Sequence, residues 1–412
     1  MSGNIRLSAD EIKSGHENAL DIFYSGIRSS ETRRTMNGNL EKFLLDACAD
    51  IFSGDYRERA RQFAEMAKED QEKATSLVLA YARKLRERTM LDKSNPGYLN
   101  PSTLPNKVKA VKKFLDMNGL GLGWKRVYVT FPDKDNTHKG RGYTRHELQK
   151  MLEYSRSIET DFVILASSSG GFRSGSWNGQ RWENVFPIYE VNGTYKIEIE
   201  KDDAANVVCA GMVIYKGTPD EYVCLISLEA WNKLVEYKKI WTERMKRPPT
   251  SSDYLVLARY VKPTPITDLA IKRRIWVLLL RTGLRSPLTE GRRRHQVPIT
   301  NGFRRYWDRI MMENGKRRGT LSALVIKERL MGHTGVVTTD KNYFWTDILD
   351  LVPEYLDAMP ELVVGEEMRL RHKLEIEKRE KEKLAASNNE KEQALQKLAE
   401  LEAKVRRMEK YS

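Results

Sequence analysis

The spacing of hydrophobic residues changes twice along this chain of 412 residues, and that change limits the folds it can adopt. Residues 17–130 carry apolar side chains at helical intervals. Residues 182–189, 194–199, 207–215 and 222–226 are instead short β-rich runs separated by turn residues. Helical spacing returns from Leu228 to about Ala358. We therefore expect an α+β protein that is mostly helical and contains one small antiparallel sheet.

Local signals mark helix starts within this pattern. Thr32 is expected to cap one helix, and residues 57–89 repeat apolar side chains at helical spacing. Thr144, with Glu147 three residues later, predicts a capping box at the start of another helix. Helices with short connections and basic surfaces suggest a small bundle in the N-terminal part of the chain.

Composition divides the chain into four parts. We expect a helical domain over residues 1–130 and a polar linker over residues 131–142, which contain Pro and Gly. Residues 143–358 form the mixed part, and residues 359–412 a charged helical tail. Apolar side chains in the tail follow a 4-3-4-3 spacing at Ala394, Leu398, Leu401, Val405 and Met408. This leaves two interpretations open, a solvated charged helix or a helix paired with a partner.

Composition also disfavours several classes of protein. The longest apolar runs, residues 275–280 and 162–166, are far shorter than the roughly 18–20 residues that cross a bilayer. The first residues contain no apolar segment of a secretory signal. Three cysteines without CxxC spacing fit neither a disulfide framework nor a thiolate zinc site. We therefore expect a cytoplasmic protein with no membrane partner.

Positive charge is concentrated in one short stretch. The chain has 71 Lys and Arg residues against 57 Asp and Glu, a net charge of +14. Residues 272–318 alone hold 14 basic and three acidic residues, interleaved with Phe303, Tyr306 and Trp307. A solvated basic face is the ordinary explanation, but so local an excess favours a surface that binds nucleic-acid phosphates. The residues that we assign to DNA contact are Lys272, Arg273, Arg274, Arg292, Arg293, Arg294 and Arg305.

Five short motifs fit one reaction. They are GGFRSGSW (residues 170–177), YKGTPD (215–220), NGFRRY (301–306), LMGHT (330–334) and NYF (342–344). The second is a tight turn between two strand-like runs and would hold Lys216 at the tip of a hairpin. Each motif alone has an ordinary explanation: Arg173 could cap a helix, and Tyr343 could pack in a core.

In their order and spacing the motifs resemble the tyrosine recombinases, also called the phage-integrase family, over about residues 15–355. ITNGFRRY followed by RLMGH and NYF is similar to the branch found in archaeal viruses and mobile elements. The resemblance implies a SAM-like helical core-binding domain over residues 1–130. It also implies a catalytic domain over residues 143–358, in which GYTRHELQKML forms the first helix.

The resemblance implies a role for each motif residue. Arg173 and Arg304 would bind the nonbridging oxygens of a phosphodiester in forked geometry, and His333 would donate a hydrogen bond to the same phosphate. Tyr343 would be the nucleophile and would leave a 3′-phosphotyrosine and a free 5′-hydroxyl. Lys216 would protonate the departing 5′-oxygen. This chemistry rests on positioning and charge, and it requires no metal and no cofactor.

Asn301 stands where the family usually has histidine, three residues before the second arginine. An asparagine side chain can hydrogen-bond to a phosphate oxygen or to the tyrosine hydroxyl, but it cannot take up a proton near neutrality. His295 lies nine residues before Arg304, so helical geometry does not bring it to that place. We interpret Asn301 as a variant catalytic ligand. Ser176, where the family often has an acidic residue, is a smaller departure.

These residues predict a site-specific DNA recombinase, the integrase of an archaeal virus or mobile element, associated with the nucleoid of a prokaryotic host. The family acts as a homo-tetramer on double-stranded attachment sites, through a Holliday junction, with or without accessory DNA-bending proteins. Its protomers usually dock a C-terminal segment onto a neighbour. Three alternatives stay open: a host chromosome-dimer resolvase of the same family, a catalytically decayed DNA-binding accessory protein, and a type IB topoisomerase.

Overall fold

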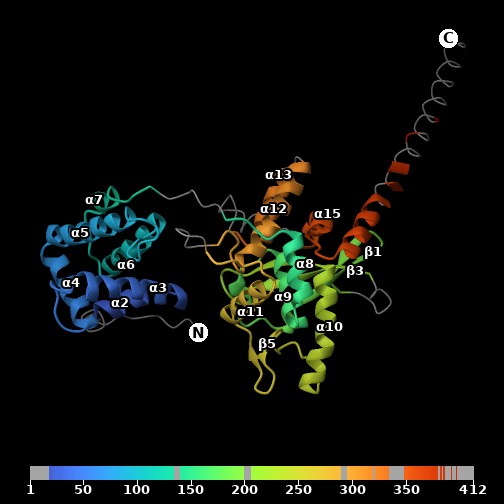
Figure 1. Ribbon diagram of the computed structural model, residues 1–412, viewed down its shortest axis with the longest axis horizontal. Coiled ribbons are helices and arrows are strands. Elements are labelled where there is room, and N and C mark those ends of the chain that lie inside the picture. The colour runs from blue at the N-terminus through green and yellow to red at the C-terminus, as the bar shows by residue number, and fades with distance from the viewer. Residues whose placement is uncertain are drawn as a thin grey trace, which may run out of the picture. The chain divides into compact units, whose positions relative to one another are not determined.

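The structure is a computed structural model that describes residues 18–133, 140–198, 206–288, 295–318, 321–333 and 348–378, together with residues 381, 382, 384, 385, 391 and 396. The chain forms two compact units, one ending at Lys139 and one that takes up most of the chain from Gly140 onward (Figure 1). Each unit has its own hydrophobic core. The expected mostly helical α+β class is confirmed.

The first unit is a helical bundle built around phenylalanine side chains. Its helices are α2 (Ala19–Ser25), α3 (Ser30–Glu41), α4 (Tyr56–Glu69), α5 (Gln71–Thr89), α6 (Leu104–Met117) and α7 (Trp124–Tyr128), with a π-helical turn over Lys42–Ala47 after α3. The buried ring of Phe63 packs against those of Phe43, Phe52 and Phe114, with centroids 5.2, 5.9 and 5.9 Å away. Aromatic pairs at such distances stabilise the packing of α4 on its neighbours.

Two helix boundaries in this unit differ from the sequence expectation. The side chain of Ser29 accepts the N–H of Thr32, so Ser29 caps α3 and the expectation for Thr32 was wrong. The helical pattern of residues 57–89 is divided at Asp70, which ends α4 and caps α5. A short polar side chain that can hydrogen-bond to nearby backbone competes with helix continuation, and periodicity alone does not detect this.

The second unit packs helices around one buried helix. Its helices are α8 (Arg145–Tyr154), α9 (Ile158–Gly170), α10 (Leu228–Met245), α11 (Asp268–Arg281), α12 (Asn301–Arg318), α13 (Leu321–Leu330) and α15 (Val352–Leu362). Most residues of α9 are buried, and the helix contacts α10, α12 and β4 (Figure 1). The predicted capping box of Thr144 and Glu147 is present at the start of α8.

A four-stranded antiparallel sheet lies in the same unit, in the order β2-β1-β3-β4. The strands are β1 (Val185–Val191), β2 (Thr194–Lys196), β3 (Val207–Ile214) and β4 (Tyr222–Ser227), so all four predicted runs are confirmed. Ile214 pairs with Tyr222, which leaves Lys216 in the connecting turn, as expected. A second, two-stranded sheet, β5 (Leu257–Arg259) and β6 (Thr264–Pro265), was not predicted, because its strands are too short for an alternating pattern.

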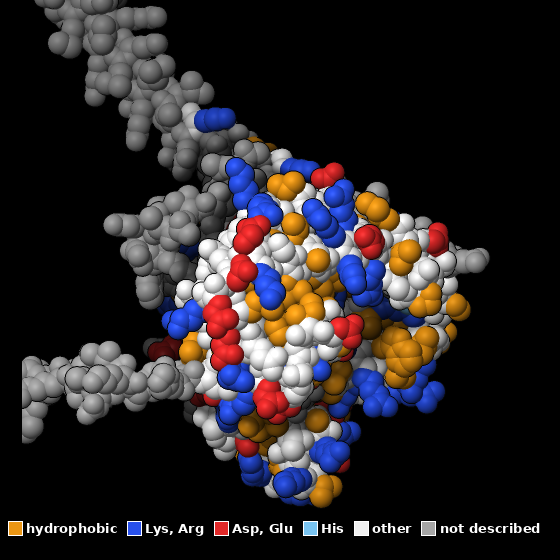
Figure 2. All heavy atoms as spheres, turned by 90° about the vertical axis from the view of Figure 1, so that its left-hand side faces the viewer, with side chains coloured by type: hydrophobic (Ala, Val, Ile, Leu, Met, Phe, Trp, Pro, Cys, Tyr) orange, Lys and Arg blue, Asp and Glu red, His pale blue; other side chains and the backbone are white. Residues whose placement is uncertain are grey.

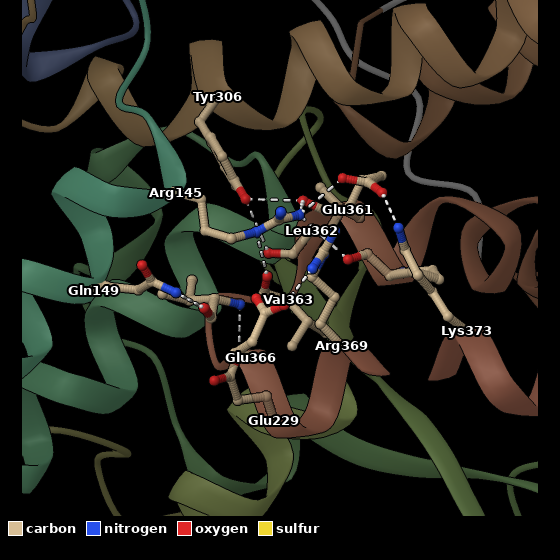
Figure 3. A network of polar contacts seen from close by, with 12 residues as sticks. Arg145, Gln149, Glu229, Tyr306, Glu361, Leu362, Val363, Glu366, Arg369 and Lys373 are labelled. Atoms are coloured by element: carbon tan, nitrogen blue, oxygen red, sulfur yellow. Dashed lines mark hydrogen bonds and ion pairs between the residues drawn. The ribbon is translucent and has the colours of Figure 1, made fainter. Parts of the chain in front are cut away.

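Polar contacts hold the C-terminal part of the second unit against α8 and α10 of the same unit (Figure 3). Arg145 of α8 donates a hydrogen bond to the carbonyl oxygen of Glu361 over 2.8 Å and pairs with the carboxylate of the same residue at 2.9 Å. The carboxylate of Glu229, on α10, accepts the N–H of Val364 over 2.8 Å. Residues 366–378 continue as a helix beyond this attachment.

The surface of the described chain is mixed in charge. On the face drawn in Figure 2, several Asp and Glu side chains form a line, others lie apart from it, and Lys and Arg side chains lie among them. None of the helices in the described ranges is long and apolar enough to cross a membrane.

Candidate active site

A pocket of about 480 Å³ opens at the N-terminal end of α12. Its lining residues are Arg173, Ser174, Gly175, Tyr215, Asn301, Arg304, Arg305, Asp308 and Met331. Three of the six predicted catalytic residues therefore meet here, although Arg173 is far from Asn301 and Arg304 in the sequence. Arg305, assigned to DNA contact from the sequence, lies at the same opening.

Arg304 is held at the floor of this pocket by its neighbours. Its Nη1 donates to the carbonyl oxygen of Gly171 over 2.8 Å, and its Nη2 donates to that of Met331 over 3.1 Å. The same Nη2 lies 2.7 Å from Nε2 of His333. The guanidinium group thus joins the end of α9, the start of α12 and the end of α13.

The start of α12 is fixed by close packing of Tyr143. The backbone N–H of Tyr143 donates to the carbonyl oxygen of Gly302, and its hydroxyl donates to that of Ile299 over 2.7 Å. A Cβ atom at Gly302 would lie 2.5 Å from the ring of Tyr143, so only glycine permits this approach. The contact sets the position of Asn301, the first residue of α12, and of Arg304 one turn later.

Arg173 stands on the loop after α9 and is exposed. The ring of Phe172 packs against that of Trp177 with centroids 5.4 Å apart, and both rings are buried. The hydroxyl of Ser176 donates to the carbonyl oxygen of Arg173. The loop is therefore fixed on both sides of Arg173, and Ser176 supports the turn that carries it.

His333 reaches the site because α13 ends in a Schellman motif. The N–H of His333 donates to the carbonyl oxygen of Glu328, and the N–H of Gly332 donates to that of Arg329. Gly332 has φ = +65°, in the left-handed region that this motif requires. The turn directs the imidazole back toward α13, where Nδ1 contacts the carboxylate of Glu328.

Two adjacent guanidinium groups make the pocket electropositive. Burial and the neighbouring charge of Arg173 both lower the pKa of Arg304. A guanidinium remains charged in proteins, so the two groups repel each other across the pocket. An anion bound between them would relieve that repulsion and accept hydrogen bonds from both.

Lys216 lies at the hairpin tip but is not among the residues that line the pocket. Its Nζ is 3.2 Å from a carboxylate oxygen of Glu183. Its neighbour Tyr215 does line the pocket, with φ = +56°, an unusual backbone conformation for a residue with a side chain. Burial raises the pKa of Tyr215, although the charges of Arg173 and Arg304 oppose the shift.

The remaining predicted residues fall in two groups. Tyr343 and Arg292, Arg293 and Arg294 lie outside the described residues. Lys272, Arg273 and Arg274 lie on α11, where Lys272 pairs with Asp268 at 2.7 Å and Arg273 is exposed. Asp268 also accepts a hydrogen bond from Ser174 over 3.4 Å, so Lys272 approaches the loop that carries Arg173.

Sequence reasoning missed four residues of this site: Tyr215, Asp308, Lys327 and Glu328. Lys327 is 7% exposed and pairs with Asp308 at 2.8 Å and with Glu328 at 3.0 Å. An acidic residue five positions before a histidine, with glycine between them, is a signal for the Schellman contact described above. No comparable local signal marks Tyr215 or Asp308, because their placement depends on tertiary packing.

A smaller basic cluster lies on the first unit. The pKa of Lys107 is lowered by burial and by the charges of Lys42 and Arg88. Arg88 also donates to the carbonyl oxygen of Gly97 over 2.9 Å. Three cations from separate helical segments are therefore crowded together, which is the arrangement that an anionic partner stabilises.

Comparison with known proteins gives similarity only at the level of solved structures. No family model matches the sequence, and no curated protein matches it. The chain resembles the integrase of the Tn1549 transposon in complex with transposon right end DNA, with a TM-score of 0.42 and 11% identity, covering 83% of this chain and 99% of that one. It also resembles XerA recombinase (TM-score 0.33, 16% identity, covering 77% and 96%) and a lambda integrase dimer bound to a COC' core site (0.39, 12%, 76% and 98%). At such low TM-scores and identities, the roles of residues in those proteins cannot be assigned to residues of this chain.

Proposed function

We propose that this protein is a site-specific DNA recombinase that cuts and rejoins DNA strands through a covalent 3′-phosphotyrosine. One observation is the main support for the proposal. Arg173 and Arg304 meet at one electropositive pocket with Asn301 at its edge, and His333 contacts Arg304 there. The four residues come from the motifs whose order and spacing resemble the tyrosine recombinases.

The proposed reaction is a transesterification at one phosphodiester. Arg173, Arg304 and His333 bind the nonbridging oxygens and stabilise the charge that gathers on them. The phenolic oxygen of Tyr343 forms the bond to phosphorus, and the bond from phosphorus to the 5′-oxygen breaks. Lys216 gives its proton to that leaving oxygen. The reverse attack by a 5′-hydroxyl restores the DNA backbone, so no external energy source is consumed.

A second candidate function is DNA binding without cleavage. Asn301 favours it, because an amide cannot accept the proton that Tyr343 must lose. The two functions share the arginine pocket and differ in one product, the covalent protein–DNA adduct. Water or another basic group has to receive the phenolic proton if the protein is an enzyme.

The test is capture of a covalent adduct. A pool of nicked duplexes with randomised sequence is incubated with the full chain. When a strand is cut shortly before the nick, the short fragment that carries the free 5′-hydroxyl dissociates, and the covalent intermediate is trapped. DNA that stays attached to protein in SDS supports the recombinase and identifies its site on sequencing. DNA binding without any adduct supports the second candidate.

The wider assignments belong to the same proposal. The first unit would serve as the core-binding domain, with Lys42, Arg88 and Lys107 as candidate phosphate contacts, and the second unit as the catalytic domain. The linker would cover residues 131–142. Four copies would act on two double-stranded attachment sites of an archaeal virus or mobile element, with exchange through a Holliday junction. Plasmid relaxation without recombinant product would instead indicate a topoisomerase, and activity on a chromosomal site alone a host resolvase.

A further inference from the structure

Both ring nitrogens of His333 are in contact with charged groups. Nδ1 contacts a carboxylate oxygen of Glu328, and Nε2 lies 2.7 Å from Nη2 of Arg304. A guanidinium N–H can only donate, so Nε2 must accept and carries no proton. An ionised carboxylate can only accept, so Nδ1 must carry the proton. His333 is therefore neutral here, in the Nδ1–H tautomer.

This protonation state has a consequence for anion binding. To donate a hydrogen bond to a phosphate oxygen, Nε2 must carry a proton. The proton on Nδ1 is already engaged by Glu328, so the ring would have to take up a second proton and become an imidazolium. A carboxylate on one side of the ring and a phosphate on the other both favour that charged form.

Glu328 is itself held in place. The Schellman motif fixes its backbone against that of His333, and Lys327 lies 3.0 Å from its second carboxylate oxygen. Lys327 in turn pairs with Asp308 at the pocket wall. Burial alone would raise the pKa of Glu328, but the hydrogen bonds from His333 and Lys327 outweigh burial and lower it. The carboxylate is thus charged near neutrality.

We propose that Glu328 is a positioning residue that fixes the tautomer of His333 and provides the charge that lets it become an imidazolium when phosphate binds. The inference rests on the proposed function for its phosphate ligand, but the tautomer and the protonation of His333 belong to the free protein. Among the described residues, the charged and titratable groups near the ring are Arg304 and Asp308 on α12, Lys327 and Glu328 on α13, Tyr222 on β4 and, beyond Arg304, Arg173.

The first test uses nitrogen NMR on the free, full-length protein labelled at histidine. The chain has six histidines, and the signals of His333 are those lost in His333→Asn. The wild type should show the Nδ1–H tautomer. Glu328→Gln should keep that tautomer, because its amide oxygen still accepts the hydrogen bond from Nδ1–H. Glu328→Ala should lose the tautomer preference.

The second test measures adduct formation against pH on the captured substrate. If an imidazolium is needed, the alkaline limb of the rate profile should move to lower pH in Glu328→Gln, which lacks the carboxylate charge. Glu243→Gln, an exposed change on α10, should match the wild type in both tests. Circular dichroism identifies a variant that has not folded. If Glu328→Ala does not fold, Glu328→Gln still tests the proposal, because glutamine is nearly isosteric with glutamate.

The outcomes separate the two proposals. An unchanged tautomer of His333 in Glu328→Ala would overturn the role of Glu328. An Nε2–H tautomer in the wild type would do the same. If no adduct forms but NMR shows the expected tautomer, the proposed function is contradicted and the positioning role of Glu328 is still supported. A pH profile that does not move in Glu328→Gln would overturn the need for an imidazolium.

Discussion

The ammonium nitrogen of Lys216 lies 3.2 Å from a carboxylate oxygen of Glu183, with the two side chains 48% and 38% exposed. An ion pair so open to water is worth only about 0–1 kcal/mol, so the lysine can leave it at little cost. The proposed general acid is therefore held near the site and remains free to move toward a bound strand.

Lys216→Ala should lower the rate of adduct formation by about 10²–10⁴-fold, the usual contribution of a general acid. A 5′-phosphorothiolate substrate should restore the rate, because a thiolate leaves without a proton. Lys262→Ala, in the turn between β5 and β6, is the matched control and should leave the rate unchanged. Failure of the sulfur substrate to rescue Lys216→Ala would assign the proton donor elsewhere.

Tyr343→Phe should abolish the adduct and leave DNA affinity nearly intact, since only the attacking oxygen is removed. Tyr215→Phe is the critical comparison, because Tyr215 lines the same pocket as Arg173 and Arg304. It should still form the adduct. An adduct that persists in Tyr343→Phe and disappears in Tyr215→Phe would make Tyr215 the nucleophile. Gel electrophoresis in SDS distinguishes the two results.

Arg304→Lys should lose most of the cleavage rate even though the charge is kept. A lysine ammonium cannot reproduce the fork that bonds to Gly171, Met331 and a phosphate together. Carbonyl oxygens left without partners should also lower the free energy of unfolding by about 1–3 kcal/mol. Arg309→Lys, an exposed change on the same helix, should affect neither the adduct assay nor chemical denaturation.

DNA affinity should fall steeply with salt if the basic stretch binds phosphates. Arg273→Ala should reduce the slope of log affinity against log salt by about 1. Lys272→Ala should reduce it less, because Asp268 already pairs with that lysine. Fluorescence anisotropy over a range of salt concentrations measures both slopes. A slope that Arg273→Ala leaves unaltered would exclude this part of α11 from the interface.

The attachment of the C-terminal segment predicts a dependence of stability on pH. Burial alone would raise the pKa of Glu361, but hydrogen bonds with Arg145 and Lys373 outweigh it and lower the pKa. A lowered folded-state pKa stabilises the fold above the unfolded value of about 4.3, and this stability is lost as the pH falls through the folded-state pKa. The stability difference between wild type and Glu361→Gln should therefore shrink as the pH falls below the unfolded-state value and through the lowered folded-state pKa.

Arg145→Met tests the same attachment from the other side. It removes the donor to the carbonyl oxygens of Glu361 and Val363, and we expect the free energy of unfolding to fall by about 2–3 kcal/mol. Arg156→Met, an exposed change just after α8, is the control and should have little effect. Equal stability of the two variants in urea denaturation would show that the attachment contributes nothing.

Much of the fold follows from local patterns, and the site follows from them only in part. The β-rich runs predicted the four-stranded sheet and the hairpin at Lys216, because side-chain alternation and turn residues are local signals. The break at Asp70 was missed, since helical periodicity is the same on both sides of it. The motifs predicted that Arg173 and Arg304 belong together. Tyr215 and Asp308 were not predicted, because they join the site only through packing between distant segments.

The hydrogen bonds that hold Glu361 and Val364 to α8 and α10 also limit domain swapping between copies of this protein. A domain swap at the C-terminus would have to break the Arg145 and Glu229 contacts in one protomer and rebuild them in another. Without such a swap, the C-terminal segment up to Val364 stays on its own protomer. The segment up to Val364 is then part of the rigid body that each protomer brings to an assembly.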